Sequence, residues 1–117
     1  MIPHVTHAGA FAILKGAIAM AAELQAPASI AVVDSDGSLL AFLRLDGAPA
    51  SSGPAAIEKA AAAVAAAAGL RGGVPVVVNG RTVGGVGVVT GGAEHDVVLA
   101  QAGIACLQTG GLRASVQ

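Results

Sequence analysis

The chain has 117 residues, of which 55% are hydrophobic and 11% are charged, and its formal net charge is −1. This length suits one domain with a buried core and is too short for two. The six Lys and Arg residues are scattered, Tyr and Trp are absent and Phe occurs twice, which argues against a nucleic-acid-binding surface. A typical soluble domain has roughly 25% charged residues, so this chain has few charges to cover its surface. We therefore expect some of its apolar surface to contact further copies in a symmetric homo-oligomer.

Cysteine usage and the chain start exclude several other classes. Cys106 is the single cysteine, so the sequence has no disulfide framework and no zinc-ligand spacing, and we expect no metal site built from cysteine. The first residues do not combine a basic stretch, an apolar stretch and a cleavage site. The Ala-rich run at residues 60–68 is too short to cross a bilayer. We therefore expect a cytoplasmic protein without a membrane partner.

The chain begins with a predicted helix over residues 7–24. Thr6 is suited to cap it, because a Thr side chain accepts a hydrogen bond from a backbone N–H of the first turn. Phe11, Leu14 and Ile18 recur at helical spacing, which indicates one apolar face.

Two hairpins are predicted, one on each side of a second helix. The first has strands near residues 29–34 and 38–45, joined through Asp36 and Gly37. The second occupies about residues 74–89 and turns at Asn79-Gly80. Asp-Gly and Asn-Gly between apolar runs are typical of hairpin turns, because these residues tolerate a positive φ.

The remaining segments predict two further helices. One begins at Ser51 or Ser52, has Pro54 in its first turn and ends near residue 68, before Gly69. The other covers about residues 93–107. The residues from 108 onwards are expected to form a loose tail. The resulting order, α-β-β-α-β-β-α, predicts an α+β fold in which helices pack on a mainly antiparallel sheet, in a single domain of residues 1–117.

A glycine cluster at Gly84, Gly85 and Gly87 lies inside the last predicted strand. It does not match a dinucleotide fingerprint, which opens a helix after a strand. Glycine within a strand indicates that another backbone or a ligand approaches closely. The sequence leaves both possibilities open, close packing of a helix or a ligand cleft.

The most site-like segment follows that strand and reads Thr90-Gly91-Gly92-Ala93-Glu94-His95-Asp96. One interpretation is an ordinary helix start, where carboxylates interact favourably with the helix dipole. The other is a binding site in which the first N–H groups of the helix and His95 meet a small anionic ligand.

Other candidate residues are charged or imidazole side chains elsewhere in the chain. Arg44 and Asp46, two apart on a predicted strand, either pair with each other or bind a substrate carboxylate through the Arg. Lys59 either pairs locally or solubilises an Ala-rich helix, or it turns inward beside the second hairpin as a site for charge recognition or amine chemistry. His4 and His7, near the chain start, are either solvated or available to a haem iron.

Several segments together resemble a known family. They are residues 30–34 with Gly37 and Leu40, Phe42-x-Arg44-x-Asp46-Gly47-Ala48, residues 56–60, Gly72-Gly73-Val74-Pro75, residues 84–88 and Glu94-His95-Asp96. In this order they resemble the GlcG/HbpS-type haem-degrading or haem-binding family, which also includes the C-terminal domain of PduO-type corrinoid adenosyltransferases. The resemblance covers nearly the whole chain. It implies a profilin-like fold, assembly into dimers or octamers, and, in some members, binding of haem or a related tetrapyrrole.

Three functional hypotheses follow. The first is a small oligomeric protein that binds a small anionic metabolite or a tetrapyrrole-like cofactor, haem or a corrinoid, in a cleft. Its predicted binding residues are Arg44, Asp46, Gly91, Gly92 and Asp96. The second is a small enzyme, an isomerase, deaminase or hydrolase of organic acids, with His95, Glu94 and Lys59 as catalytic residues. The third is a structural subunit of an assembly.

Overall fold

A computed structural model describes residues 3–65, 73–109 and 116–117 of the chain. Its elements, in chain order, are α1 (His7–Leu24), β1 (Ser29–Asp34), β2 (Leu39–Arg44), α2 (Ser52–Ala65), β3 (Gly73–Val78), β4 (Arg81–Val89) and α3 (Ala93–Thr109). The predicted order of helices and strands is thereby confirmed. The expected end of the second helix near residue 68, and its stop at Gly69, lie outside the described residues.

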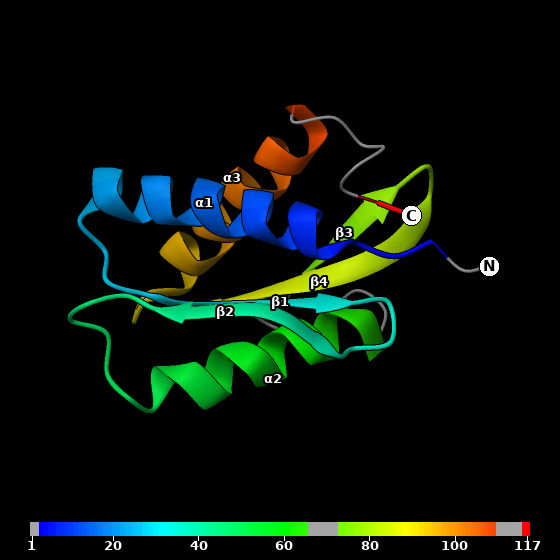
Figure 1. Ribbon diagram of the computed structural model, residues 1–117. Coiled ribbons are helices and arrows are strands. Elements are labelled where there is room, and N and C mark those ends of the chain that lie inside the picture. The colour runs from blue at the N-terminus through cyan, green and yellow to red at the C-terminus, as the bar shows by residue number, and fades with distance from the viewer. Residues whose placement is uncertain (1–2, 66–72, 110–115) are drawn as a thin grey trace.

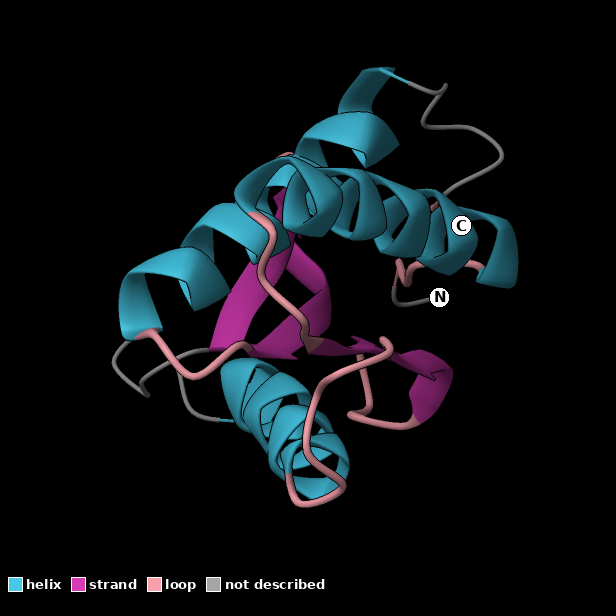
Figure 2. Cartoon of the chain, turned by 90° about the vertical axis from the view of Figure 1, so that its left-hand side faces the viewer, coloured by secondary structure: helices cyan, strands magenta, loops and turns pink. Residues whose placement is uncertain are grey.

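The elements form three layers with the sheet in the middle (Figure 1). The sheet has the order β2-β1-β4-β3, and each neighbouring pair is antiparallel. Helices α1 and α3 cover one face and pack against each other, whereas α2 covers the opposite face (Figure 2). The predicted α+β fold, an antiparallel sheet packed with helices, is therefore confirmed.

Local sequence signals explain where these elements begin and turn. The Thr6 hydroxyl accepts a hydrogen bond from the Gly9 N–H at 3.1 Å, as expected of an N-cap. Asn79 and Gly80 both have positive φ, 52° and 77°, the combination that a type I′ hairpin turn requires. In the other hairpin Gly37 supplies the positive φ.

Strand β1 separates two hydrophobic clusters because its side chains alternate between the two faces of the sheet. Ile30 and Val32 belong to the larger cluster, under α1 and α3. Ala31 and Val33 belong to the smaller cluster, under α2. The smaller cluster is built largely from alanine and valine, so α2 lies close to the sheet.

The glycines of β4 allow this close approach. A Cβ atom added to Gly87 would collide with the Ala56 carbonyl oxygen, and one added to Gly85 would lie 2.5 Å from the Ala60 carbonyl oxygen. Both carbonyls belong to α2. The sequence left open whether these glycines allow close helix packing or form a ligand cleft. The structure shows that they allow close packing of α2.

The two ends of the described chain meet. Val5 forms an isolated bridge with Val116, and His4 and Gln117 exchange backbone hydrogen bonds. The structure thus differs from the expected loose tail at its last two residues. Residues 110–115 of that tail lie outside the described residues.

Within the described residues, α1 is the one helix that could cross a membrane by length and composition. A core helix of a soluble protein passes the same test, and α1 packs on α3 and the sheet.

Candidate functional site

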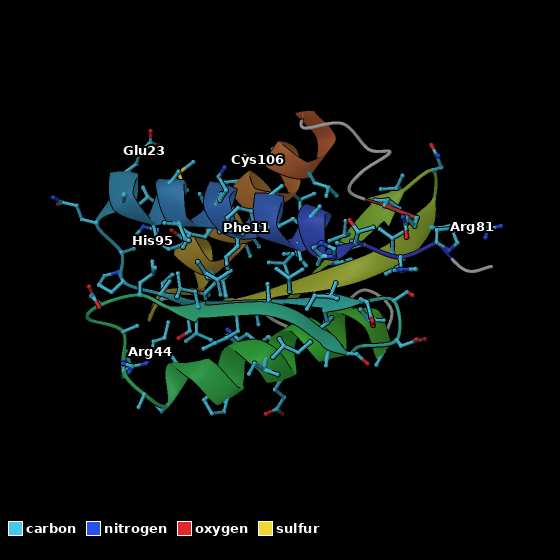
Figure 3. The ribbon with its side chains drawn as sticks, viewed as in Figure 1. Phe11, Glu23, Arg44, Arg81, His95 and Cys106 are labelled. Carbon is cyan, nitrogen blue, oxygen red and sulfur yellow. The ribbon has the colours of Figure 1, made fainter. Side chains whose placement is uncertain are left out.

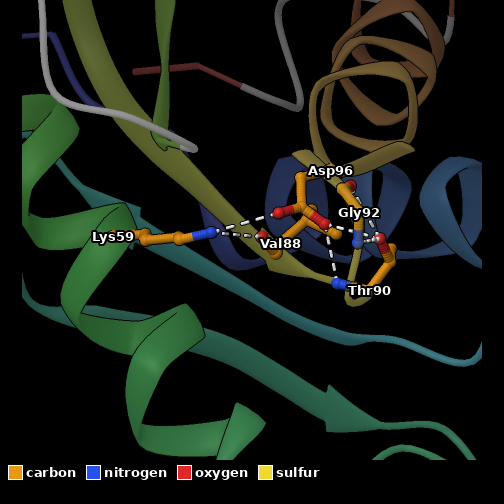
Figure 4. Close-up of polar contacts among 5 residues, drawn as sticks. All are labelled: Lys59, Val88, Thr90, Gly92 and Asp96. Carbon is orange, nitrogen blue, oxygen red and sulfur yellow. Dashed lines mark hydrogen bonds and ion pairs between the residues drawn. The ribbon is translucent and has the colours of Figure 1, made fainter. Parts of the chain in front are cut away.

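A polar cluster joins the two helical layers at the end of β4 (Figure 4). Lys59, on α2, reaches past the strand end toward α3. Its ammonium lies 3.1 Å from Asp96 Oδ2 and donates a second hydrogen bond to the Val88 carbonyl oxygen at 3.3 Å. The other carboxylate oxygen, Asp96 Oδ1, accepts hydrogen bonds from the N–H and the hydroxyl of Thr90, each at 2.7 Å. We call Lys59, Thr90 and Asp96 the polar cluster.

Burial makes this cluster structurally important. The Asp96 side chain is 6% exposed and the Lys59 side chain 28%. A buried carboxylate is costly unless it is paired and hydrogen-bonded, and Asp96 has partners on both oxygens. It also lies in the first turn of α3, where the helix dipole favours a negative charge. Lys59 therefore points inward and is ion-paired with Asp96, while a role in charge recognition or amine chemistry stays a prediction.

Thr90 fixes the turn between β4 and α3. Its hydroxyl accepts a hydrogen bond from the Gly92 N–H at 3.1 Å and contacts Asp96 Oδ1. The Thr90 and Gly92 N–H groups are therefore engaged within the turn itself. Gly91 supplies a φ of 99°, and an added Cβ would meet nothing within 4 Å at Gly91 or Gly92.

Directly beyond this turn lies a cavity of about 320 Å³, lined by Gly92, Ala93, Glu94 and His95. All four residues are exposed. The imidazole and the carboxylate of neighbouring residues thus border one open cavity at the start of α3. Asp96 lies behind it, in the polar cluster, so its position suits orienting the helix start more than touching a ligand.

The other predicted binding residues lie elsewhere. Arg44 Nη1 donates a hydrogen bond to the Ala48 carbonyl oxygen at 2.9 Å, and the described residues contain no Arg44–Asp46 ion pair. Figure 3 shows Arg44 on the α2 side of the sheet and His95 on the opposite side. Asp46 borders a second cavity, of about 300 Å³, at the end of α1. Lys59, Arg44 and His95 therefore do not converge on one cavity.

Thr90 lies in the segment that the sequence marks as site-like, but no role was predicted for its side chain. A signal existed, since Thr90-Gly91-Gly92 precedes a helix and threonine is a frequent partner of backbone groups at helix starts. The sequence could not show that Asp96 would turn back to meet both the Thr90 N–H and hydroxyl. Among the described residues no three His, Cys, Asp or Glu side chains gather to hold a metal ion.

Comparison with known proteins identifies relatives. The model of the HbpS-like family, described as haem degrading protein HbpS-like, matches residues 5–71. The crystal structure of the Klebsiella pneumoniae protein ORFY is 26% identical, with a TM-score of 0.87 over 92% of each chain. A complex of PduOC with haem is 25% identical, with a TM-score of 0.78 over 88% of this chain and 94% of that one.

A double mutant of HbpS from Streptomyces reticuli is 30% identical, with a TM-score of 0.79 over 87% of this chain and 86% of that one. No curated protein sequence matches the chain. The family match covers more than half of the sequence, and the solved relatives share its fold over most of their length. The chain therefore belongs to the family of HbpS-like haem-degrading proteins.

Proposed function

We propose that this protein binds haem at the cavity beside the start of α3, with the His95 imidazole as the iron ligand. The observation that carries the proposal is the exposed His95 on the rim of a cavity of about 320 Å³. Support comes from one relative that was solved as a complex with haem and from the matching family model, which is described as haem degrading.

The residues around the cavity fit one face of a planar ligand. Gly92 has no side-chain carbon and Ala93 has only a methyl group, so a flat ring can approach the backbone. Val98, one turn after His95, lies on the same side of α3 and is 40% exposed, which offers apolar contact. Neutral imidazole nitrogen is a common ligand of iron in proteins. The positive end of the α3 dipole favours a carboxylate of the ligand near the first turn. Glu94 repels such a carboxylate on its own side of the cavity.

The polar cluster has a positioning role in this proposal. Asp96 ties α3 to Thr90 on one side and to Lys59 of α2 on the other. Contacts that already fix the start of the helix lower the cost of ordering a binding site when the ligand arrives. Lys59 and Asp96 are therefore expected to affect haem affinity through the position of His95, without touching the ligand.

Haem titration tests the proposal. Haemin added to the protein is expected to give a Soret band that shifts on binding, and His95→Ala should abolish the shift while leaving the thermal unfolding midpoint unchanged, because His95 is exposed. His4→Ala and His7→Ala are the matched controls, since they remove the other two histidines of the chain. An unchanged spectrum in His95→Ala, or a spectrum lost in His7→Ala instead, would contradict the proposal.

The two alternative functions have no specific structural observation in their favour. Catalysis by Lys59, Glu94 and His95 on an organic acid stays a prediction. The Lys59 ammonium is ion-paired and hydrogen-bonded, which disfavours a role as a free amine nucleophile. A purely structural role, corrinoid binding and a cytoplasmic location also stay predictions from the sequence.

A further inference from the structure

The cavity of about 300 Å³ that Asp46 borders lies between the end of α1 and the end of β2. Both elements end on the same side of the molecule (Figure 1). Three segments form its walls, namely the last two turns of α1, the loop that joins α1 to β1, and the first residues after β2. We call this space the α1 cavity. It shares no lining residue with the cavity at the start of α3.

The two loops that border the α1 cavity are held against each other. The Leu45 N–H donates a hydrogen bond to the Ala28 carbonyl oxygen at 2.8 Å, which ties the end of β2 to the chain that follows α1. A Cβ atom added to Gly47 would lie 3.2 Å from the Pro27 ring, so these two residues are also in close contact. A ligand would therefore meet walls that are already formed, which lowers the cost of binding.

The inner walls of the α1 cavity are apolar. Ile18 and Leu45 are partly buried, pack against the larger hydrophobic cluster and border the cavity with the rest of their surface. Hydrocarbon placed against these side chains would be removed from water, which favours binding. The volume lies at the small end of the range for ligand pockets. The walls therefore suit a small molecule with a hydrocarbon part.

The charges around the α1 cavity favour a cation. Because α1 ends here, the negative end of its dipole lies at the cavity, and no basic residue stands in its last turn. Asp46 adds an exposed carboxylate to the lining. Among the described residues no cation pairs with Asp46, since the guanidinium of Arg44 donates to the Ala48 carbonyl oxygen on the α2 side of the sheet. The cavity at α3 has the opposite polarity, because a helix begins there.

We propose that the α1 cavity binds a small organic ammonium ion, with the hydrocarbon part against Ile18 and Leu45 and the ammonium group beside the Asp46 carboxylate. A bare inorganic cation would leave the apolar walls in contact with water. An organic anion would face both the Asp46 carboxylate and the negative end of α1. This proposal does not depend on haem binding, because the two cavities have separate linings.

Three ligands that share a six-membered ring test the charge preference: cyclohexylammonium, cyclohexanol and cyclohexanecarboxylate. Each is titrated into the full chain, and binding is followed by the NMR chemical shifts of the backbone amides. Affinity should fall in that order, with the largest shifts around Ala22 and Leu45, which line the cavity. Equal affinities for the ammonium and the alcohol, or shifts confined to other parts of the chain, would overturn the proposal.

Substitution of Asp46 tests the carboxylate itself. Asp46→Asn should weaken binding of cyclohexylammonium by about threefold, the scale of one exposed ion pair, and leave binding of cyclohexanol unchanged. Asp36→Asn is the matched control, because it removes another exposed carboxylate at the opposite end of the sheet, and should change neither affinity. An ammonium affinity that is retained in Asp46→Asn, or lost equally in Asp36→Asn, would contradict the proposal.

Two further variants test the location of the site. Ala22 lines the cavity from an exposed position on α1, so Ala22→Phe should weaken binding of the ammonium and of the alcohol by the same factor. His95→Ala, at the other cavity, should leave both affinities unchanged. Loss of ammonium binding in His95→Ala together with unchanged binding in Ala22→Phe would place the ligand at the α3 cavity and overturn the proposal.

Discussion

Two glycine-rich segments that lie close together in the sequence have opposite surroundings. Gly85 and Gly87, in β4, face the α2 backbone, and an added Cβ at either would collide with a carbonyl oxygen. Gly91 and Gly92, a few residues later, have nothing within 4 Å of an added Cβ. The first pair allows α2 to pack on the sheet, and the second pair leaves the start of α3 uncovered. A glycine cluster in a sequence therefore does not by itself indicate a binding site.

The largest expected effect is a loss of stability that distinguishes the two glycine pairs. Gly87→Ala should destabilise the protein by about 3 kcal/mol or more, because the new methyl group meets the Ala56 backbone and α2 must move off the sheet. Chemical denaturation of the variant measures the change.

Gly92→Ala is the matched control for Gly87→Ala. It should cost less than about 1 kcal/mol, the scale of replacing a helix N-cap residue, because the site is open. Equal losses in the two variants would show that the contrast between the two glycine pairs is wrong.

The second expected effect concerns the Asp96 carboxylate, which holds the turn between β4 and α3 in place. Asp96→Ala should lower the free energy of unfolding by about 3 kcal/mol, since it leaves the Lys59 ammonium and the Thr90 N–H without their partner. Denaturant unfolding measures this. A loss below about 0.5 kcal/mol would mean that the cluster does not hold α3 in place.

The third expected effect is smaller. Lys59→Met should cost about 2 kcal/mol, because the buried Asp96 carboxylate loses its counter-ion but keeps both hydrogen bonds from Thr90. The same denaturation experiment applies. A larger loss of stability in Lys59→Met than in Asp96→Ala would contradict this ranking of the two variants.

The smallest expected effect lies on the cavity rim. Glu94→Gln should change stability by no more than about 0.5 kcal/mol, the scale of an exposed charge in the first turn of a helix. The same variant should leave or modestly strengthen haemin affinity in a titration, because a negative charge beside an anionic ligand is removed. A marked loss of affinity would instead indicate that Glu94 contacts the ligand.

Local signals in the sequence predicted much of the fold. The first helix has the predicted bounds, residues 7–24, and the Thr6 cap is observed. Asn79-Gly80 forms the expected turn with positive φ at both residues. These features depend on neighbouring residues, so the pattern of the sequence contains them.

The site was harder to predict because its contacts are long-range. The pairing of Lys59 with Asp96 joins residues 37 positions apart in the chain. Arg44 does not lie beside His95, because alternation along β2 directs Arg44 to the α2 side, where its guanidinium donates a hydrogen bond to the Ala48 carbonyl oxygen. Such outcomes depend on how layers pack, which composition and spacing do not specify.

A crystal structure of the haem-loaded protein would test the central claim most directly. The account predicts iron bound to the His95 imidazole, with the ring over Gly92 and Ala93 and the Lys59–Asp96 pair intact behind it. Iron bound by His4 or His7, with the α3 cavity empty, would contradict it.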